Sequence, residues 1–414
     1  MTASPDSEGR ARAARWLAAW DAQGIHRTGT EGDNAGAEWL AGEAAALGAE
    51  LSIEEFAIER LDPVTAFLEI GGNRIAAIPA FDAPATDTAG VGGRLGLTGG
   101  AADIAVAELS PRAVHSGEYE RLRRAGGHCG FVIVCDGHSP GMALLNAEGF
   151  REPYGAPAIH VSSEARAAVL AAAVQGAPAR LVADSRRTQA YARNVVVTLD
   201  GSGRGGPPLV VMTPRSSWWQ STAERGGGIV CWLESLRALL AAPPRGPVIF
   251  TANTGHELGH FGLDEFIALR PGWDRPAHRG GATWLLYGAN IGAAGGSLSV
   301  VSPQDDLREL CAAELARADQ PHRMAAKERV PNGETRDIHL AGGRCATLVG
   351  TNKLFHLPQD RWPDAVDLAA VTGIAASAAR IVLALTRAEA PRPVDADEPP
   401  PIRIIRLFKT GDDT

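Results

Sequence analysis

The chain has 414 residues, of which 45% are hydrophobic and 21% charged, and its formal net charge is −8. This length predicts two or three domains, and the composition is ordinary for a globular protein. The acidic balance and the lack of a basic cluster argue against a nucleic-acid partner. No apolar run approaches about 18 residues, so we expect no membrane span. The first ten residues are polar, and the five cysteines are scattered, which together favour reduced thiols and a cytoplasmic location.

The first 85 residues predict two helices followed by two strands. Apolar residues recur at helical spacing from Ala11 to Trp20 and from Ala35 to Leu47, and Gly48 ends the second helix. Alternating apolar residues then indicate strands from Glu50 to Ile58 and from Thr65 to Ile70.

Residues 86–192 are dense in Gly and Ala and predict a smaller α+β unit. Short apolar runs at Phe131–Cys135 and Ala158–Val161 indicate strands, and the segments Gly117–Ala125 and Ser163–Val174 indicate amphipathic helices.

Residues 193–390 alternate strands with longer helices, which is the pattern of an α/β fold. Strand runs occur at Asn194–Leu199 and Pro208–Met212. A long helix with Ile229 and Leu236 on one face follows, and Val366–Leu385 predicts the last helix. Residues 391–414 begin as a Pro-rich linker and continue into an apolar IRIIRLF segment.

The most informative stretch is Gly246–Phe266. A buried strand (Val248–Ala252) ends in a turn, and His256, Glu257 and His260 follow at the edge where open α/β sheets place their chemistry. The letters HELGH fit the helical HExxH zinc pattern, in which two His on one helix face bind the metal. That pattern needs a helix already running at the first His, whereas a strand and Gly255 precede His256, so His256 can at best open a helix.

The same stretch resembles the EExG segment of the zinc aminopeptidase family with co-catalytic metals, which includes aminopeptidase Y-like enzymes and relatives of glutamate carboxypeptidase II and of glutaminyl cyclases. Further resemblances follow in the family's order along nearly the whole chain. They are RTGT (27–30), the protease-associated-like residues 86–192, TPRSSWWQSTAERGGG, TWLLYGANIGAAGG, NGETRDIHL and FHLPQDRW.

The resemblance implies a mixed, mostly parallel sheet with helices on both faces and a smaller inserted domain. Residues 1–85 and 193–390 would form the peptidase-like core, and residues 86–192 would form a protease-associated insert.

The resemblance also shows a strongly altered metal site. Thr213 stands where a metal-binding His is expected, Arg215 where its partner Asp would be, and Gly292 where a third ligand would be. Glu334 stands at another usual Asp, and His256 stands where the family has its general base.

One set of family ligands is retained. The resemblance implies one divalent metal, zinc or alternatively manganese, held by Glu224, Glu257 and His356. His256 would then act as acid and base, because a neutral imidazole can take a proton near pH 7. Arg215 would supply a fixed positive charge.

The predicted function is hydrolysis of an amide or related bond. The substrate would be a small molecule, anionic or aromatic, or a peptide-like compound. The chain is also a candidate for forming a homodimer. The remaining site residues add to this set: His260 as a further catalytic residue, and Thr213, Ser216, Trp218, Trp219 and Arg225 as substrate-binding residues.

Two alternatives stay open. In one, Arg215, Glu224 and Arg225 form a buried ion network that replaces both metals, and the enzyme works without a metal. In the other, the chain is an inactive peptidase-like protein that binds a small ligand or partner in the same cleft.

Overall fold

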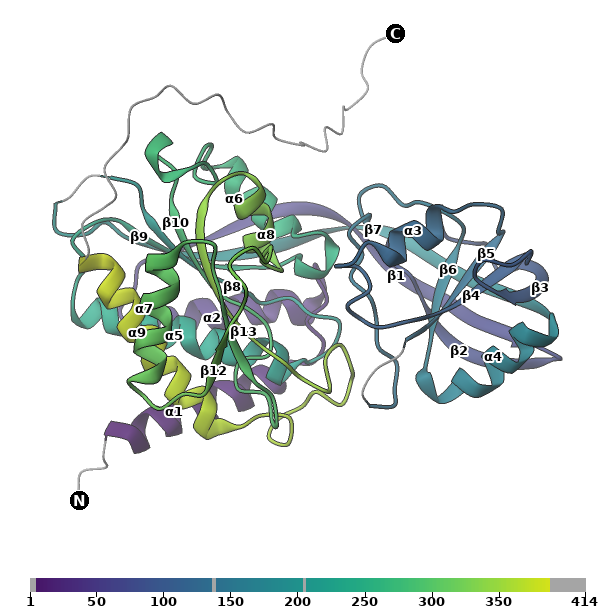
Figure 1. Cartoon of the computed structure of the whole chain (residues 1–414), viewed down its shortest axis with the longest axis horizontal. Coiled ribbons are helices and arrows are strands. Elements are labelled where there is room, and N and C mark those ends of the chain that lie inside the picture. The colour runs from purple at the N-terminus through teal and green to yellow at the C-terminus, as the bar shows by residue number, and fades with distance from the viewer. Residues whose placement is uncertain (1–4, 136–138, 204–205, 388–414) are drawn as a thin grey trace, which may run out of the picture.

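The computed structural model describes residues 5–135, 139–203 and 206–387 (Figure 1). The Pro-rich linker and the apolar segment expected near the C-terminus lie outside the described residues.

One mixed sheet of thirteen strands organises the described part of the chain. The strands are β1 (Leu51–Ile70), β2 (Asn73–Pro79), β3 (Val91–Leu97), β4 (Ile104–Leu109), β5 (Gly130–Cys135), β6 (Ala158–Val161), β7 (Pro178–Leu199), β8 (Leu209–Pro214), β9 (Val248–Asn253), β10 (Thr283–Tyr287), β11 (Leu298–Val301), β12 (His322–Met324) and β13 (Arg344–Gly350). Their spatial order is β1-β2-β6-β5-β4-β3-β7-β9-β8-β10-β13-β11-β12. This confirms the expected α/β fold with a mixed sheet.

Helices cover the sheet on both faces. They are α1 (Pro5–Asp21), α2 (Glu31–Ala46), α3 (Glu118–Arg124), α4 (Arg166–Gln175), α5 (Gly227–Ala241), α6 (Phe261–Ala268), α7 (Asp305–Ala316), α8 (Glu334–Leu340) and α9 (Leu368–Arg387). Short 3₁₀ or π turns lie at Ser163–Ala165, Thr222–Gly226, His256–Leu258 and Ala277–Arg279.

The two-residue alternation of the strands explains the layers. Val195 and Val197 of β7 join the core beneath α1, α2, α5, α7 and α9, whereas Val196 joins the core beneath α6 and α8. Phe250 and Ile249 of β9 divide between the same two cores. Successive side chains on a strand point to opposite faces, so these runs of consecutive apolar residues fit strands that are covered on both sides.

Strands β1 and β7 join the main body to a second lobe. They pair antiparallel along nearly their whole length, and Figure 1 shows them running from the body into the lobe that holds β2 to β6, α3 and α4. The two strands expected before residue 70 are thus one strand, whose pairing with β7 shifts register between Pro63 and Thr65. Pro63 lacks a backbone N–H, and a bulge is where a strand tolerates this. The resemblance of the lobe to a protease-associated domain stays a prediction.

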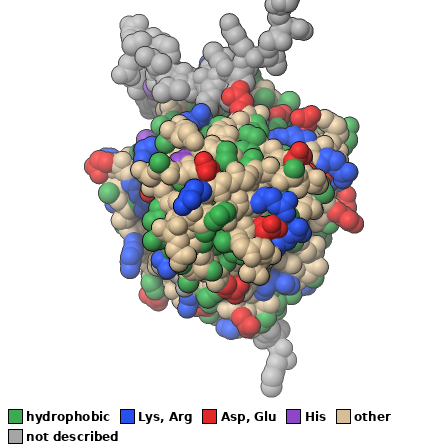
Figure 2. Space-filling view, turned by 90° about the vertical axis from the view of Figure 1, so that its right-hand side faces the viewer, with side chains coloured by type: hydrophobic (Ala, Val, Ile, Leu, Met, Phe, Trp, Pro, Cys, Tyr) green, Lys and Arg blue, Asp and Glu red, His purple; other side chains and the backbone are tan. Residues whose placement is uncertain are grey.

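The lobe has an apolar interior of its own. Val106, Val132 and Ile159 form one buried cluster, and Ala107, Phe131 and Ile133 belong to another that includes residues of β4 to β6 facing the opposite way. Figure 2 looks at the molecule from the side of this lobe, where acidic and basic side chains are intermixed with small apolar areas. This face therefore shows no single-sign charged surface.

Helix α9 is more apolar than its sequence pattern led us to expect. Among the described residues it is the one helix long and apolar enough to cross a membrane by length and composition alone. Val371, Ile374 and Ile381 on this helix are buried in the main core, together with residues of α5. One face of this helix therefore packs in the main core, while other residues along it are only partly buried.

Candidate active site and metal centre

The candidate site lies at the carboxyl ends of two neighbouring parallel strands. β8 and β9 pair in parallel up to Pro214 and Asn253, and the chain leaves both strands at this edge. Helix α8 begins nearby at Glu334, whose carboxylate contacts the loop after β9. This is the position at which open α/β sheets place their ligands.

The HELGH segment does not form a continuous helix. His256–Leu258 make one 3₁₀ turn, Gly255 and Gly259 both have positive φ, and α6 starts only at Phe261. His260 itself has a φ of 62°, a conformation that is uncommon outside glycine. The prediction that His256 only opens a helix is confirmed. The bent segment nevertheless places the His256 and His260 rings 5.2 Å apart between centroids.

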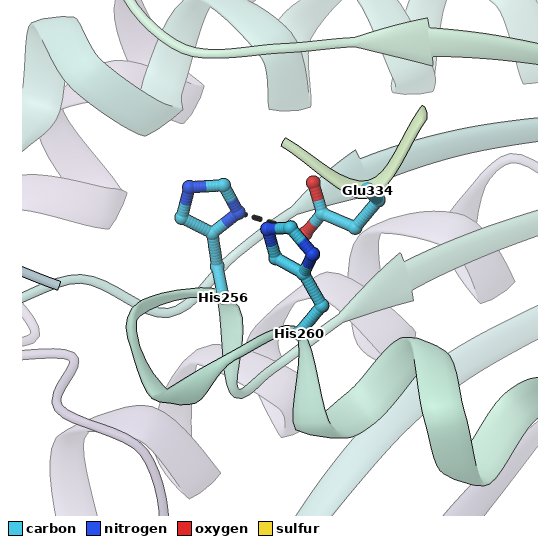
Figure 3. Close-up of side chains that lie close together, drawn as sticks. All are labelled: His256, His260 and Glu334. Atoms are coloured by element: carbon cyan, nitrogen blue, oxygen red, sulfur yellow. Dashed lines mark hydrogen bonds and ion pairs between the residues drawn. The ribbon is translucent and has the colours of Figure 1, made fainter. Parts of the chain in front are cut away.

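His256, His260 and Glu334 lie close together (Figure 3). His256 Nδ1 lies 2.9 Å from Glu334 Oε1, and one ligand atom from each of the three residues lies within 4.8 Å of the other two. Within the described ranges this is the one such group of three His, Cys, Asp or Glu side chains. Glu334 is buried, and its Oε2 has no hydrogen-bond partner. We call these three residues the His–His–Glu triad.

Asp337 supports the triad from the first turn of α8. Its Oδ2 lies 2.6 Å from His260 Nδ1, which leaves His260 Nε2 to face away from Asp337. Burial disfavours the charged imidazole, but the Asp337 carboxylate outweighs it and raises the pKa of His260 to about 9. Burial also works against an ionised Glu334, yet His256 and His260 hold its pKa well below the usual range.

A second cluster, which we call the Arg225 cluster, lies deeper. It consists of Ser216, Glu224, Arg225, Glu257 and His356, and every member is at most 2% exposed. Arg225 Nη2 lies 2.8 Å from Glu224 Oε1 and 2.5 Å from Glu257 Oε1. The contact with Glu224 is an ion pair whose angles do not make a hydrogen bond, since both Glu224 oxygens lack a hydrogen-bond partner.

Ser216 joins this cluster to the loop of His256. Its Oγ donates to Glu257 Oε2 at 2.7 Å and accepts from the His256 backbone N–H at 3.0 Å. Its carbonyl accepts from Arg225 Nε at 2.6 Å. The triad and the Arg225 cluster are therefore neighbouring parts of one polar region.

His356 presents a lone pair to the Arg225 cluster. Its Nδ1 is 2.5 Å from the carbonyl oxygen of Leu144, which can only accept, so Nδ1 carries the proton. Burial lowers the pKa of His356 to about 3, so the ring is neutral and its Nε2 is an acceptor. This Nε2 has no hydrogen-bond partner and lies 3.6 Å from Glu224 Oε1.

The ligand set implied by the resemblance thus comes together around a guanidinium group. Glu224, Glu257 and His356 are neighbours, but Arg225 lies between the two carboxylates. A cation held by the same two carboxylates would have to displace it. The cluster as it stands does not fit the zinc ions of the family, whereas the ligand atoms of the His–His–Glu triad all lie within 4.8 Å of one another.

The side chains of Arg215 and Thr213 contact residues outside both groups. Arg215 is fully buried, and its Nη1 donates to Asp33 Oδ1 at 2.7 Å. Thr213 Oγ1 donates to the carbonyl of Tyr287 at 2.9 Å, between β8 and β10. The fixed positive charge expected of Arg215 is supplied at this cluster by Arg225.

The two tryptophans differ in their surroundings. Trp218 is buried against Phe81 with ring centroids 4.7 Å apart. Trp219 is half-buried, and its Nε1 donates to the carbonyl of His356 at 2.9 Å. Trp218 is therefore part of a packed interior, and Trp219 fixes the backbone of His356.

The second lobe supplies a cover for the site. The Ala147 N–H donates to the carbonyl of Glu257 at 2.7 Å, and Glu148 pairs with Arg336 at 2.7 Å, next to Asp337. Together with the Leu144 carbonyl, these contacts hold residues 144–148 over both groups. The sequence patterns pointed to none of these residues and not to Asp337. A signal for Asp337 existed, because an acidic residue three positions after Glu334 lies on the same face of a helix.

Comparisons with known proteins give the fold. No family model matches the chain, and no curated protein matches it. BSAP, a zinc aminopeptidase from Bacillus subtilis, superposes with a TM-score of 0.71 at 17% identity, covering 91% of this chain and 94% of that one. An aminopeptidase from Aneurinibacillus sp. strain AM-1 gives 0.67 at 16% identity, covering 95% and 96%. A Peptidase M28 precursor from Shewanella amazonensis SB2B gives 0.70 at 14% identity, covering 94% and 100%.

The chain has the fold of these aminopeptidases. The match spans the body and the lobe together, since each comparison covers more than nine-tenths of both chains. The expected fold relationship is thereby confirmed, while the roles of the individual site residues stay predictions.

Proposed function

We propose that the chain is a divergent, peptidase-like hydrolase that cleaves an amide or related bond with one divalent metal ion, held by the His–His–Glu triad. The observation that carries the proposal is the convergence of His256, His260 and Glu334 at the carboxyl edge of the sheet, in a fold shared with zinc aminopeptidases.

The chemistry of the donors favours zinc. Two imidazoles and one carboxylate are a common set for catalytic zinc, with a fourth position left for water or substrate. Asp337, which contacts His260 Nδ1, stands in the position of the outer-shell carboxylate that orients a metal-binding imidazole. The unpartnered Oε2 of Glu334 offers a further lone pair in the same place.

A bound zinc would supply a nucleophile from water at neutral pH and polarise the substrate carbonyl. The protein's own residues do the rest. Asp337 fixes the His260 ring, Ser216 fixes the backbone of His256, and the cover at residues 144–148 limits access of bulk water. In this proposal His256 is a ligand, which replaces the acid–base role inferred from the sequence.

The proposal specifies the substrate by the amide or related bond that is cleaved and not by its charge or aromatic character. The expected preference for an anionic or aromatic substrate rested on Arg215 and Trp218, and both are buried in contacts with other residues, Asp33 and Phe81. We therefore propose a small amide-bearing substrate that reaches the partly exposed edge at His256.

Metal content tests the proposal. The protein is purified without added metal, loaded with zinc or cobalt, and analysed for bound metal per chain. We expect one ion in the wild type, no stable binding in Glu334→Gln or His260→Ala, and a 10- to 100-fold weaker affinity, by the usual effect of an outer-shell partner, in Asp337→Asn. His278→Ala, outside both groups, is the matched control. A wild type that binds no ion after reconstitution would refute the metal centre.

Turnover tests the reaction. A panel of amino-acid anilides and small amides is offered to the zinc-loaded protein, and hydrolysis should disappear in the variants that lose the metal.

A catalytically inactive binding protein is the second candidate. It is favoured by one observation: the Arg225 cluster is almost fully buried and covered by the lobe. Metal binding without hydrolysis of any amide in the panel would support this candidate over the enzyme.

A further inference from the structure

The Arg225 cluster contains one cation and two carboxylates in a place that water does not reach. Glu224 and Glu257 both contact Arg225 Nη2, and the three side chains are at most 2% exposed. A guanidinium group does not lose its proton in proteins. Arg225 is thus a permanent cation here, and it compensates carboxylates that would be costly to bury alone.

The remaining lone pairs of the cluster have the spacing of metal ligands. Glu224 Oε1 and His356 Nε2 are 3.6 Å apart, and both can only accept. Two ligands bound at about 2.0–2.2 Å to one tetrahedral ion lie roughly 3.4 Å apart. Neither His356 Nε2 nor Glu224 Oε2 has a hydrogen-bond partner, and both are buried. The acceptors on this side of the cluster therefore lack a hydrogen-bond donor, while Arg225 donates to Glu257.

We infer that the Arg225 cluster is a metal centre whose cation position is occupied by the chain's own arginine. The guanidinium takes the place of a divalent cation between Glu224 and Glu257, so the native protein binds no ion there. Replacing Arg225 with a neutral side chain should create a site for one zinc-class ion made by Glu224, Glu257 and His356. The inference concerns other residues than the His–His–Glu triad, and it does not depend on the proposed function.

The test is made in a His260→Ala background, so that the triad does not contribute. The parent and its Arg225→Met variant are titrated with cobalt, whose visible absorption reports coordination, and with zinc in competition with a chromogenic chelator. We expect no stable ion in the parent and one per chain in the variant. Adding Glu224→Gln should abolish the gain, and Arg225→Lys, which keeps the charge, should show none.

Arg225→Met leaves two buried carboxylates unpaired and can impair folding. The variant is therefore also refolded with zinc and with a chelator, and its circular dichroism is recorded. The inference expects the native spectrum with zinc and a weaker one, or none, with chelator. A folded variant that binds no more metal than the parent, or a variant that fails to fold under both conditions, would overturn it. The two proposals can fail separately. If the wild type binds no metal but the Arg225→Met variant gains an ion, the triad proposal fails and this inference stands.

Discussion

The buried pair between Arg215 and Asp33 gives the sharpest test of what Arg215 does. Asp33 lies in the first turn of α2 and accepts from the Gly29 N–H and from Thr254 Oγ1, each at 2.8 Å, besides its contact of 2.7 Å with Arg215. Both charged side chains are fully buried. Removing one partner of such a pair typically costs about 3–5 kcal/mol, because the other charge stays buried without compensation.

Asp33→Asn keeps the shape of the side chain and removes its charge. We therefore expect its free energy of unfolding, measured by urea denaturation at pH 7, to fall by about 3–5 kcal/mol. Native stabilities are about 5–15 kcal/mol, so the variant should be marginal. Asp264→Asn is the control, because the side chains of Arg151 and Asp264 in its pair are 38% and 49% exposed, and this pair should contribute at most about 1 kcal/mol.

Replacing both partners separates a structural role from a catalytic one. If Arg215 only neutralises Asp33, Asp33→Ala combined with Arg215→Met should recover much of the stability lost in either single variant, since buried pairs are often exchanged for apolar residues at little cost. Turnover and metal binding of the double variant should then be close to wild type. A loss below about 1 kcal/mol in Asp33→Asn would refute the reasoning.

Two glycines and one histidine give further predictions. Gly42 lies inside α2, and no atom comes within 4 Å of the place that a Cβ would take, so Gly42→Ala should raise the free energy of unfolding by up to about 1 kcal/mol. Gly227→Ala should lower it severely, because a Cβ there would lie 1.9 Å from the Ile291 carbonyl oxygen; equal midpoints for the two variants in a denaturant titration would contradict this contrast. Burial lowers the pKa of His160 to about 3, so its neutral form contributes stability above the unfolded pKa near 6.5, and this is lost as the pH falls. At pH 5 the loss in the free energy of unfolding is about 2 kcal/mol. The free energy of unfolding of His160→Gln should therefore fall less between pH 7 and pH 5 than that of the wild type, and equal falls would contradict the assignment.

The layers were predictable from the sequence because their signal is local. The period-two and helical patterns sit within each element, and strands such as β5 and β9 appear within one or two residues of the expected bounds. Strand β1 is the instructive exception. The local pattern predicts two strands, Glu50–Ile58 and Thr65–Ile70, but pairing with β7 across nearly the whole length makes them one.

The candidate site was predictable only in part, for a physical reason. The strand-and-turn pattern located His256, Glu257 and His260 at the carboxyl edge without any tertiary information. Glu334 joins them from 78 residues beyond His256, and the lobe adds Leu144 from 212 residues before His356. Such contacts depend on how the elements pack, and no local pattern encodes them.

Arg225, and not Arg215, supplies the positive charge at the cluster, and local patterns could not predict this either. Arg225 belongs to the turn before α5. Thr222–Gly226 form a π turn at the start of α5, and the carboxylate of Asp360 accepts from the N–H groups of Ala223 and Glu224. A π turn is wider than an α turn, so consecutive side chains diverge less around its axis. From consecutive positions of this turn, Arg225 Nη2 reaches the carboxylates of both Glu224 and Glu257. The turn thus lets a residue next to a carboxylate act as its counter-ion, which is the arrangement that the Arg225→Met experiment examines.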